Sequence, residues 1–185
     1  MASVVPTTLT SVAATKPMAG KVMVAPTTDG CCVRIEGRGT MQESPAAKAI
    51  AAGTLRNDSN AHVVVDLSAC DYLDSTFLGC LVQLFRDFGN KTSSRFHVAG
   101  SADKRKKLMG PCHLDKVIPS LDAAPQTIGN WVPVPVPPVG SKDLARHIME
   151  CHKLLAELDS PMRPAFLKIA EQLQRELNEP AAKPH

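Results

Sequence analysis

The chain has 185 residues, of which 44% are hydrophobic and 21% charged, so it is a folded globular protein rather than a disordered or fibrous one. This length suffices for one hydrophobic core and is short for two full domains. The net charge of +3 predicts no strongly basic surface for nucleic acid, and no apolar stretch is long enough for a membrane helix.

The first predicted elements follow an acid-free segment rich in Thr, Ala, Val and Pro, which we interpret as a flexible tail over residues 1–20. Lys21–Ala25 and Cys31–Gly37 are short runs typical of strands, and the "TTDG" turn signal between them predicts a hairpin. A helix is then expected from Ser44 to Gly53, because Pro suits its first turn and Gly its end.

A buried strand is predicted at His62–Ser68, because its apolar residues run continuously instead of alternating. The spacing becomes helical from Thr76 to Phe88, with one apolar stripe at Phe77, Leu81, Phe85 and Phe88. The tandem hydroxyls of Ser75 and Thr76 therefore lie at a strand-to-helix turn, directly after Asp74.

Three further elements complete the predicted body. They are a strand at Arg95–Gly100, a helix that Ser101 caps and Gly110 ends, and a last strand at Lys116–Ile118. Alternating strands and helices predict parallel pairing, so residues 21–120 are expected to form one α/β domain. The basic cluster at 104–107 is either a solvated helix face or a contact for phosphate or an acidic partner.

Residues 121–140 contain five prolines and predict an extended connection, in which Trp131 is expected to pin the chain to the core. Residues 141–178 show two amphipathic helical patterns separated by Asp159-Ser160-Pro161, followed by a tail at 179–185. This helical hairpin is expected to pack on the domain, and a dimer through it is left open.

Two kinds of chemistry find little support in the sequence. His147, Cys151 and His152 share a helix, but zinc needs convergent ligands and no second pair has a useful spacing, so no metal or cofactor is expected. The six cysteines form no CxxC pair, and most lie in apolar segments, which indicates reduced thiols in the cytoplasm.

Ser75 has three interpretations from residue types alone. It can cap the following helix, as can Asp74 and Thr76. It can accept a phosphate, which the free N–H groups and dipole of a helix start tolerate. It can also be the nucleophile of a small hydrolase, although no Gly-x-Ser-x-Gly motif surrounds it and no His can be placed beside it from sequence.

The stretch "VVVDLSACDYLDSTFLGCLVQLF" resembles the signature of STAS domains, and specifically that of bacterial anti-sigma factor antagonists: an apolar strand, Asp-Leu, a short loop, Asp-Ser-Ser/Thr-Gly-Leu-Gly and an apolar helix. "VRIEGRGT", "FHVAGSADKRKKLM" and "LDKVIP" extend the resemblance over roughly residues 21–120. It implies a STAS-like α/β fold, with a small mixed sheet and helices mainly on one face, to which this chain adds the C-terminal hairpin.

The resemblance also implies a non-enzymatic partner switch. In that family the unphosphorylated antagonist binds an anti-sigma factor that is also a serine kinase, phosphorylation ends the binding, and a serine phosphatase restores it. By position, the acceptor is Ser75 with Thr76 as the fallback, and the implied partner-binding residues are Asp66, Asp74, Ser75, Thr76, Phe77, Leu78 and Thr40. ATP and metal would belong to the partners. A STAS module that binds a ligand or serves as a scaffold without phosphorylation is the alternative.

Two positions depart from the family pattern. Phe77 replaces the Gly after the two hydroxyls, which is expected to place a bulky side chain next to the acceptor or to make the contact surface more apolar. Thr40 stands in the turn after "VRIEG" where relatives often carry an acid, so a partner contact there is in question.

Overall fold

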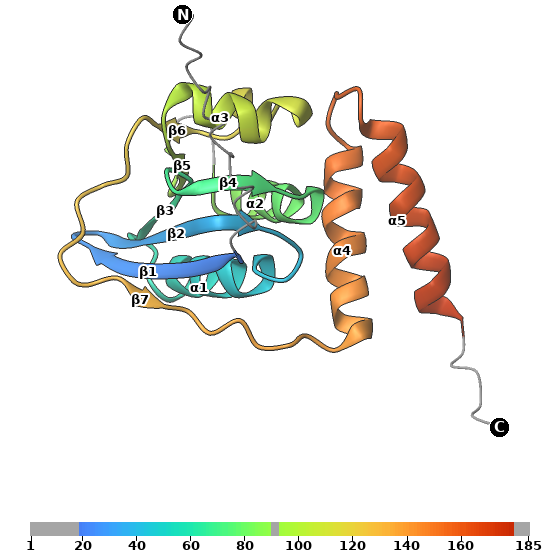
Figure 1. Ribbon diagram of the computed structural model, residues 1–185, viewed down its shortest axis with the longest axis horizontal. Helices are drawn as coiled ribbons and strands as arrows, with labels where there is room; N and C mark the ends of the chain where they lie inside the picture. The colour runs from blue at the N-terminus through green and yellow to red at the C-terminus, as the bar shows by residue number, and fades with distance from the viewer. Residues whose placement is uncertain (1–18, 90–92, 180–185) are drawn as a thin grey trace, which may run out of the picture.

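The fold is that of a computed structural model, which describes residues 19–89 and 93–179. One mixed sheet runs through the middle of the molecule, with helices behind it and at one end (Figure 1). The strands of the described residues are β1 (Lys21–Thr27), β2 (Gly30–Gly39), β3 (His62–Asp66), β4 (Cys70–Leu73), β5 (Phe96–Ala99), β6 (Ser120–Leu121) and β7 (Val132–Pro133).

The sheet order is β6-β5-β3-β2-β1-β7, and β4 pairs with the far end of β2. β1 and β2 form the predicted antiparallel hairpin, whereas β2, β3, β5 and β6 are parallel neighbours, as the alternation of strands and helices predicts. β4 and β7 are additions that the sequence did not indicate. The predicted mixed α/β fold is confirmed.

Five α-helices occur in the described residues: α1 (Ser44–Asn57), α2 (Ser75–Phe88), α3 (Ala102–Met109), α4 (Ser141–Ala156) and α5 (Arg163–Asn178). α1 and α2 lie side by side on one face of the sheet, and α4 stands across their ends with α5 on its outer side (Figure 1). Two short 3₁₀ turns follow α3, at Gly110–Cys112 and Leu114–Lys116. The predicted tails at 1–20 and 179–185 lie outside the described residues, apart from residues 19, 20 and 179.

Two predicted element boundaries are wrong. The first helix does not end at Gly53 but continues to Asn57, since the helical backbone there needs no bend and a Gly without close neighbours is tolerated inside a helix. The last strand is not Lys116–Ile118, because Lys116 is the last residue of a 3₁₀ turn and the chain reaches the sheet only at Ser120.

Alternation along the strands divides the core between the two faces of the sheet. Val33, Ile35, Val63 and Val65 face α1 and α2 and belong to the main core cluster. Cys32, Val64 and Ala99 point to the opposite face, where Ala124 and Trp131 of the Pro-rich connection pack on them. The prediction that Trp131 pins the connection to the core is therefore confirmed.

An ion pair on this second face ties the connection to two strands. The parallel register places Arg34 of β2 beside Asp66 of β3, and Arg34 Nε donates to Asp66 Oδ2 at 2.7 Å. The Arg34 guanidinium also stacks on the Trp131 ring, 3.9 Å from its centroid. Because the Asp66 side chain is fully buried, removal of Arg34 would leave its carboxylate without a charged partner inside the protein.

Arg34→Ala should lower the free energy of unfolding by about 3 kcal/mol, because the buried carboxylate of Asp66 would lose its charged partner. Urea denaturation would measure the change. Arg146→Ala is the control, since its exposed pair with Asp143 should contribute less than about 0.5 kcal/mol. Equal stability of both variants would contradict a structural role for the Arg34–Asp66 pair.

Candidate functional site at the start of helix α2

Asp74 alone provides the side-chain cap of α2. Its backbone is extended, and its Oδ1 accepts a hydrogen bond from the Phe77 N–H at 2.8 Å. Its Oδ2 accepts another from the Met41 N–H at 2.7 Å, which ties the β2–α1 loop to the start of α2. Of the three hydroxyl or carboxyl candidates for the cap, the structure selects Asp74, so the Ser75 hydroxyl has no capping task.

The Ser75 hydroxyl contacts a histidine from the C-terminal hairpin. Ser75 Oγ lies 2.9 Å from Nε2 of His152 in α4, and Nδ1 of the same ring lies 2.8 Å from the Ile148 carbonyl oxygen. Because a carbonyl only accepts, the geometry assigns the donor role to Nδ1, which leaves Nε2 to accept from the Ser75 hydroxyl. The His152 side chain is 3% exposed and packs against Phe166 of α5.

A second pair of the same kind lies one helix away. Ser44, the first residue of α1, has its Oγ 2.8 Å from Nε2 of His147 in α4. Ser44 does not cap α1, since it lies inside the helix, and Glu43 occupies the cap position without a side-chain cap. Burial, with a smaller contribution from the Lys48 ammonium, lowers the pKa of His147 to about 4, so this histidine is neutral at pH 7.

The structure places most of the predicted partner-binding residues inside the molecule. Thr76 and Leu78 are 4% and 5% exposed, and Asp66 is fully buried in its pair with Arg34 and accepts a hydrogen bond from the Ser68 N–H at 2.9 Å. Asp66 therefore cannot contact a partner directly. Asp74 and Ser75 remain partly exposed, so Ser75 is less buried than the fallback Thr76.

Phe77 does not lie beside the acceptor on the surface, contrary to the expectation from its position in the motif. Its side chain is fully buried, as the predicted apolar stripe requires, and packs near Gly39 of β2. A Cβ on Gly39 would lie 3.1 Å from the Phe77 ring and 2.6 Å from Leu73, so the absence of a side chain there leaves room for this ring.

Thr40 lies next to an acidic residue, Glu43, that is not part of the family motif. The Thr40 N–H and hydroxyl both donate to Glu43 Oε2, at 2.9 and 2.6 Å. The β2–α1 loop thus carries a carboxylate three residues after the expected place, beside the loop residue Met41 that Asp74 holds.

The sequence did not indicate the roles of His147 and His152. The sequence suggests them only as metal ligands, but in the structure each ring forms a hydrogen bond with a serine of another helix, Ser44 of α1 or Ser75 of α2. Among the described residues, no group of three His, Cys, Asp or Glu side chains is arranged to hold a metal ion. No local signal could have found the pairs, because His152 is 77 residues from Ser75.

The predicted basic cluster divides into two parts. Lys104 Nζ donates to the Cys70 carbonyl at 2.8 Å, and Arg105 binds the Leu121 carbonyl and Asp122, so these two side chains hold α3 to β4 and β6. Lys106 and Lys107 are exposed to solvent.

In the described part of the chain, no helix has both the length and the apolar character needed to cross a membrane.

Comparison with known proteins finds a likeness among solved structures. No family model and no curated protein matches the chain. Among solved structures, the chain is similar to the crystal structure of an anti-sigma factor antagonist from Mycobacterium paratuberculosis, with 23% identity, a TM-score of 0.48, and coverage of 57% of this chain and 87% of that one. The assignment of a function therefore rests on the residues of this chain.

Acidification should weaken the contact between α4 and α1. The pKa of His147 is lowered in the folded state, so between pH 6.5 and about 4 the unfolded chain binds a proton that the folded chain does not. The free energy of unfolding therefore decreases as the pH is lowered through this window. The thermal midpoint of the wild type should fall over this window, and that of His147→Gln should fall less. His97→Gln is the comparison variant, because burial also lowers the pKa of His97, away from α4. Equal slopes in His147→Gln and the wild type would contradict a buried neutral His147.

Phe77→Ala should destabilise the protein by about 3–5 kcal/mol in urea denaturation, as expected for a fully buried ring that leaves a cavity. Ile128→Ala, at a side chain that is 69% exposed, should change stability by less than about 0.5 kcal/mol. A small effect of Phe77→Ala would mean that this ring is not part of the core.

Proposed function

We propose that this protein is an anti-sigma factor antagonist that acts by phosphorylation-controlled partner switching at Ser75. The observation that carries the proposal is the division of tasks at the start of α2. Asp74 caps the helix, so the neighbouring Ser75 hydroxyl can be modified without removing the cap. The resemblance of the surrounding motif to those of anti-sigma factor antagonists supports the same assignment.

The physical effect of a phosphate at this position is local. The free N–H groups and positive dipole end of the first turn favour an anion, so α2 would remain folded. The added charge of about −1.5 to −2 would join the carboxylates of Asp74 and Glu43 near the β2–α1 loop. A partner that binds this surface when Ser75 is unmodified would then face a concentrated negative charge and an unfavourable desolvation.

The partners follow from this mechanism. The unphosphorylated protein would bind an anti-sigma factor that is also a serine kinase, and a serine phosphatase would reverse the modification. Catalysis, ATP and metal belong to these partners in the proposal, and the chain itself acts without catalysis, nucleic acid or membrane. The six buried, unbridged cysteines support a cytoplasmic location. The apolar side chains that α5 leaves exposed, such as Leu167, would be the site of any self-association.

The Ser75–His152 pair favours one other function enough to be weighed. A serine hydroxyl that donates to one imidazole nitrogen, while the other nitrogen donates to an acceptor, is the arrangement that a nucleophile and its base need. A hydrolase also needs a substrate site, but this imidazole is 3% exposed between packed helices. The pair therefore supports a packing contact better than a catalytic dyad. The alternative of a ligand-binding or scaffold module without phosphorylation is separated from the switch by the following experiment.

Incubation with ATP and an anti-sigma factor kinase of the same organism should add one phosphate, which mass spectrometry should locate on Ser75. Ser75→Ala should abolish the label and retain binding to that kinase in calorimetry, whereas Ser75→Asp should weaken binding at least about tenfold, or about 1.4 kcal/mol. Ser44→Ala is the matched control, since it removes the equivalent serine–histidine bond from α1.

Label on a residue other than Ser75, or full-strength binding by Ser75→Asp, would overturn the switch. Absence of label with every serine kinase of the organism would favour the scaffold module. Release of an acyl or phosphoryl product from a chromogenic ester by the protein alone, lost in Ser75→Ala, would instead support the hydrolase.

A further inference from the structure

Helix α4 lies directly on the surface that the proposed switch uses. His152 covers the Ser75 hydroxyl, and one turn further along α2 the two helices approach closely at Gly79. A Cβ on Gly79 would lie 2.5 Å from both Cβ and the carbonyl oxygen of Cys151, which no ordinary contact allows. The face of α2 that carries the proposed phosphate acceptor is therefore also the face on which α4 packs.

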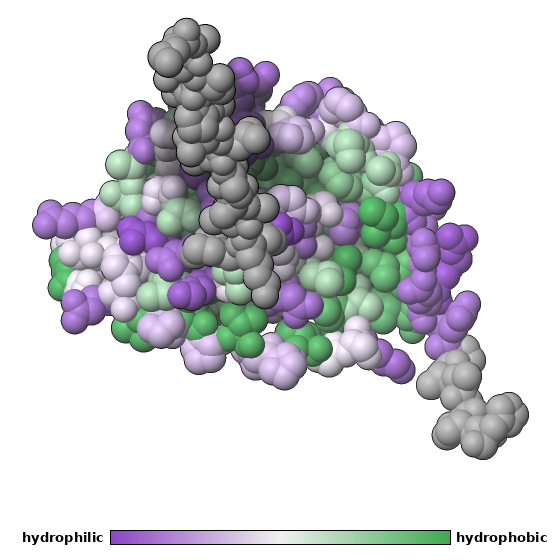
Figure 2. Space-filling model, in the orientation of Figure 1, coloured by the Kyte–Doolittle hydropathy of each residue, from purple (hydrophilic) through white to green (hydrophobic). Residues whose placement is uncertain are grey.

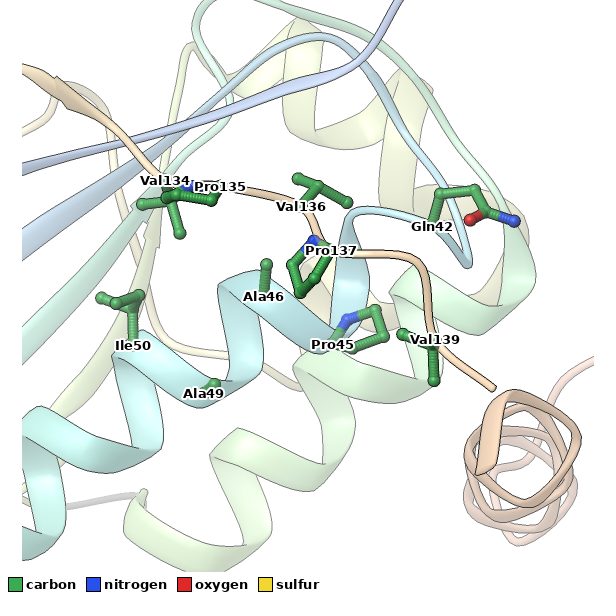
Figure 3. Close-up of a pocket in the computed structure, with 10 residues that line it drawn as sticks. All are labelled: Gln42, Pro45, Ala46, Ala49, Ile50, Val134, Pro135, Val136, Pro137 and Val139. Atoms are coloured by element: carbon green, nitrogen blue, oxygen red, sulfur yellow. The ribbon is translucent and has the colours of Figure 1, made fainter. Parts of the chain in front are cut away.

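The hairpin of α4 and α5 is joined to the domain by a segment with few attachments. In the described residues, the last backbone hydrogen bond between the connection and the sheet is the one that the Val134 N–H donates to the Val22 carbonyl, at 2.8 Å. Beyond it, residues 135–139 lie over α1 across an apolar groove of about 260 Å³ (Figure 3). Three of these five residues are prolines, so the segment is semi-rigid and depends little on the sheet for its shape.

α5 is held mainly by α4. Of the α5 side chains, only those of Phe166 and Ala170 are buried, and Leu167 and Ile169 are 48% and 39% exposed. Figure 2 shows apolar residues gathered over α4 and α5 on the viewed face, and hydrophilic residues along the outer edge of α5. Because α5 packs mainly on α4, a movement of α4 away from α2 would carry α5 with it and would withdraw Cys151 and Leu155 from the main core.

We propose that residues 141–178 form an intramolecular lid that covers Ser75 in the free protein and must swing away before Ser75 can be phosphorylated or bind a partner. The proposal rests on the proposed function, since it concerns the regulation of the same site. The lid and the partner would compete for one face of α2, so the fraction of open molecules sets the apparent affinity for the partner and the rate of modification.

In the closed state the Ser75 hydroxyl is engaged by His152, whose Nε2 lies 2.9 Å from Oγ. In phosphoryl transfer Ser75 Oγ forms a bond to the γ-phosphorus of ATP, the bond to the ADP oxygen breaks, and the hydroxyl proton passes to a base of the kinase. The hydrogen bond to His152 has to break for that proton to reach the kinase, and the ring blocks approach to Oγ from the side of α4. Burial also raises the pKa of the Cys151 thiol, so this lid residue is protected from thiol reagents while the lid is closed.

A cysteine at position 75 reports access to the site without any kinase. The rate of maleimide labelling of Ser75→Cys should rise about tenfold when Gly79→Ala is added, within the roughly 5- to 150-fold range of typical couplings. Mass spectrometry would separate this thiol from the six native ones and should also show faster labelling of Cys151. Ala102→Cys is the matched control, because it places the thiol at the first residue of α3, which is exposed and away from α4, and its rate should not change.

Gly79→Ala should keep the body of the protein folded, since alanine favours the helix more than glycine does and the three atoms nearest to the added Cβ all belong to Cys151 of α4. Leu155→Ala, which shortens a fully buried lid side chain, provides a second way to loosen the contact if the first variant unfolds. Circular dichroism would check both. Unchanged labelling at position 75 in both folded variants would overturn the lid.

His152→Gln separates the lid from a catalytic part for this histidine. With the kinase and ATP, the lid predicts faster phosphorylation of Ser75 in this variant and in Gly79→Ala, because both loosen α4. Slower phosphorylation in His152→Gln would make His152 the base for Ser75 and overturn the lid. If no variant is phosphorylated but Gly79→Ala still accelerates labelling at position 75, the lid stands and the proposed switch fails.

Discussion

Strand β2 determines where the site lies, because it is longer than either of its parallel neighbours. Its first half pairs with β3, and its end from Gly37 to Gly39 pairs with β4, with a register shift between Gly37 and Arg38. β2 and β4 run in the same direction and end side by side at Gly39 and Leu73. The helices that follow them, α1 and α2, therefore begin next to each other, and a single helix laid across both starts can reach Ser44 and Ser75 together.

The two helix starts differ in a way that matters for function. α2 has a side-chain cap from Asp74, which also accepts from the Met41 N–H and so joins the two starts, whereas α1 has none. Ser44 is fully buried under His147, but Ser75 keeps partial exposure beside His152. Of two equivalent serine–histidine pairs, only the one on α2 combines an independent cap with a serine that is partly exposed. This combination suits a residue that gains and loses a phosphate while its helix stays folded.

The elements that the sequence predicted well are those with strong local signals. The β1–β2 hairpin, the buried β3 and the apolar stripe of α2 each follow from periodicity or turn residues over a short window. β4 was missed because it has only four residues, contains no β-branched residue, and is buried at both ends but exposed in the middle instead of alternating. The part of Phe77 was misjudged because the motif position suggested the surface, whereas space at Gly39, 38 residues earlier, allows the ring to enter the core.

The sequence by itself determined the α/β class, the place of the tandem hydroxyls at a strand-to-helix turn and the C-terminal hairpin, since each depends on residues close together in the chain. Only the tertiary structure decided that Asp74 is the cap, that Asp66 is committed to Arg34, and that His152 lies over Ser75. The Arg34–Asp66 and Ser75–His152 contacts join residues brought together by strand register and helix packing, whereas the cap is a local contact for which the sequence offered three neighbouring candidates. No periodicity or spacing in the sequence predicts the hydrogen bond between Ser75 and His152, which are 77 residues apart. It forms only once β2 and β4 have positioned α2 so that α4 packs on it.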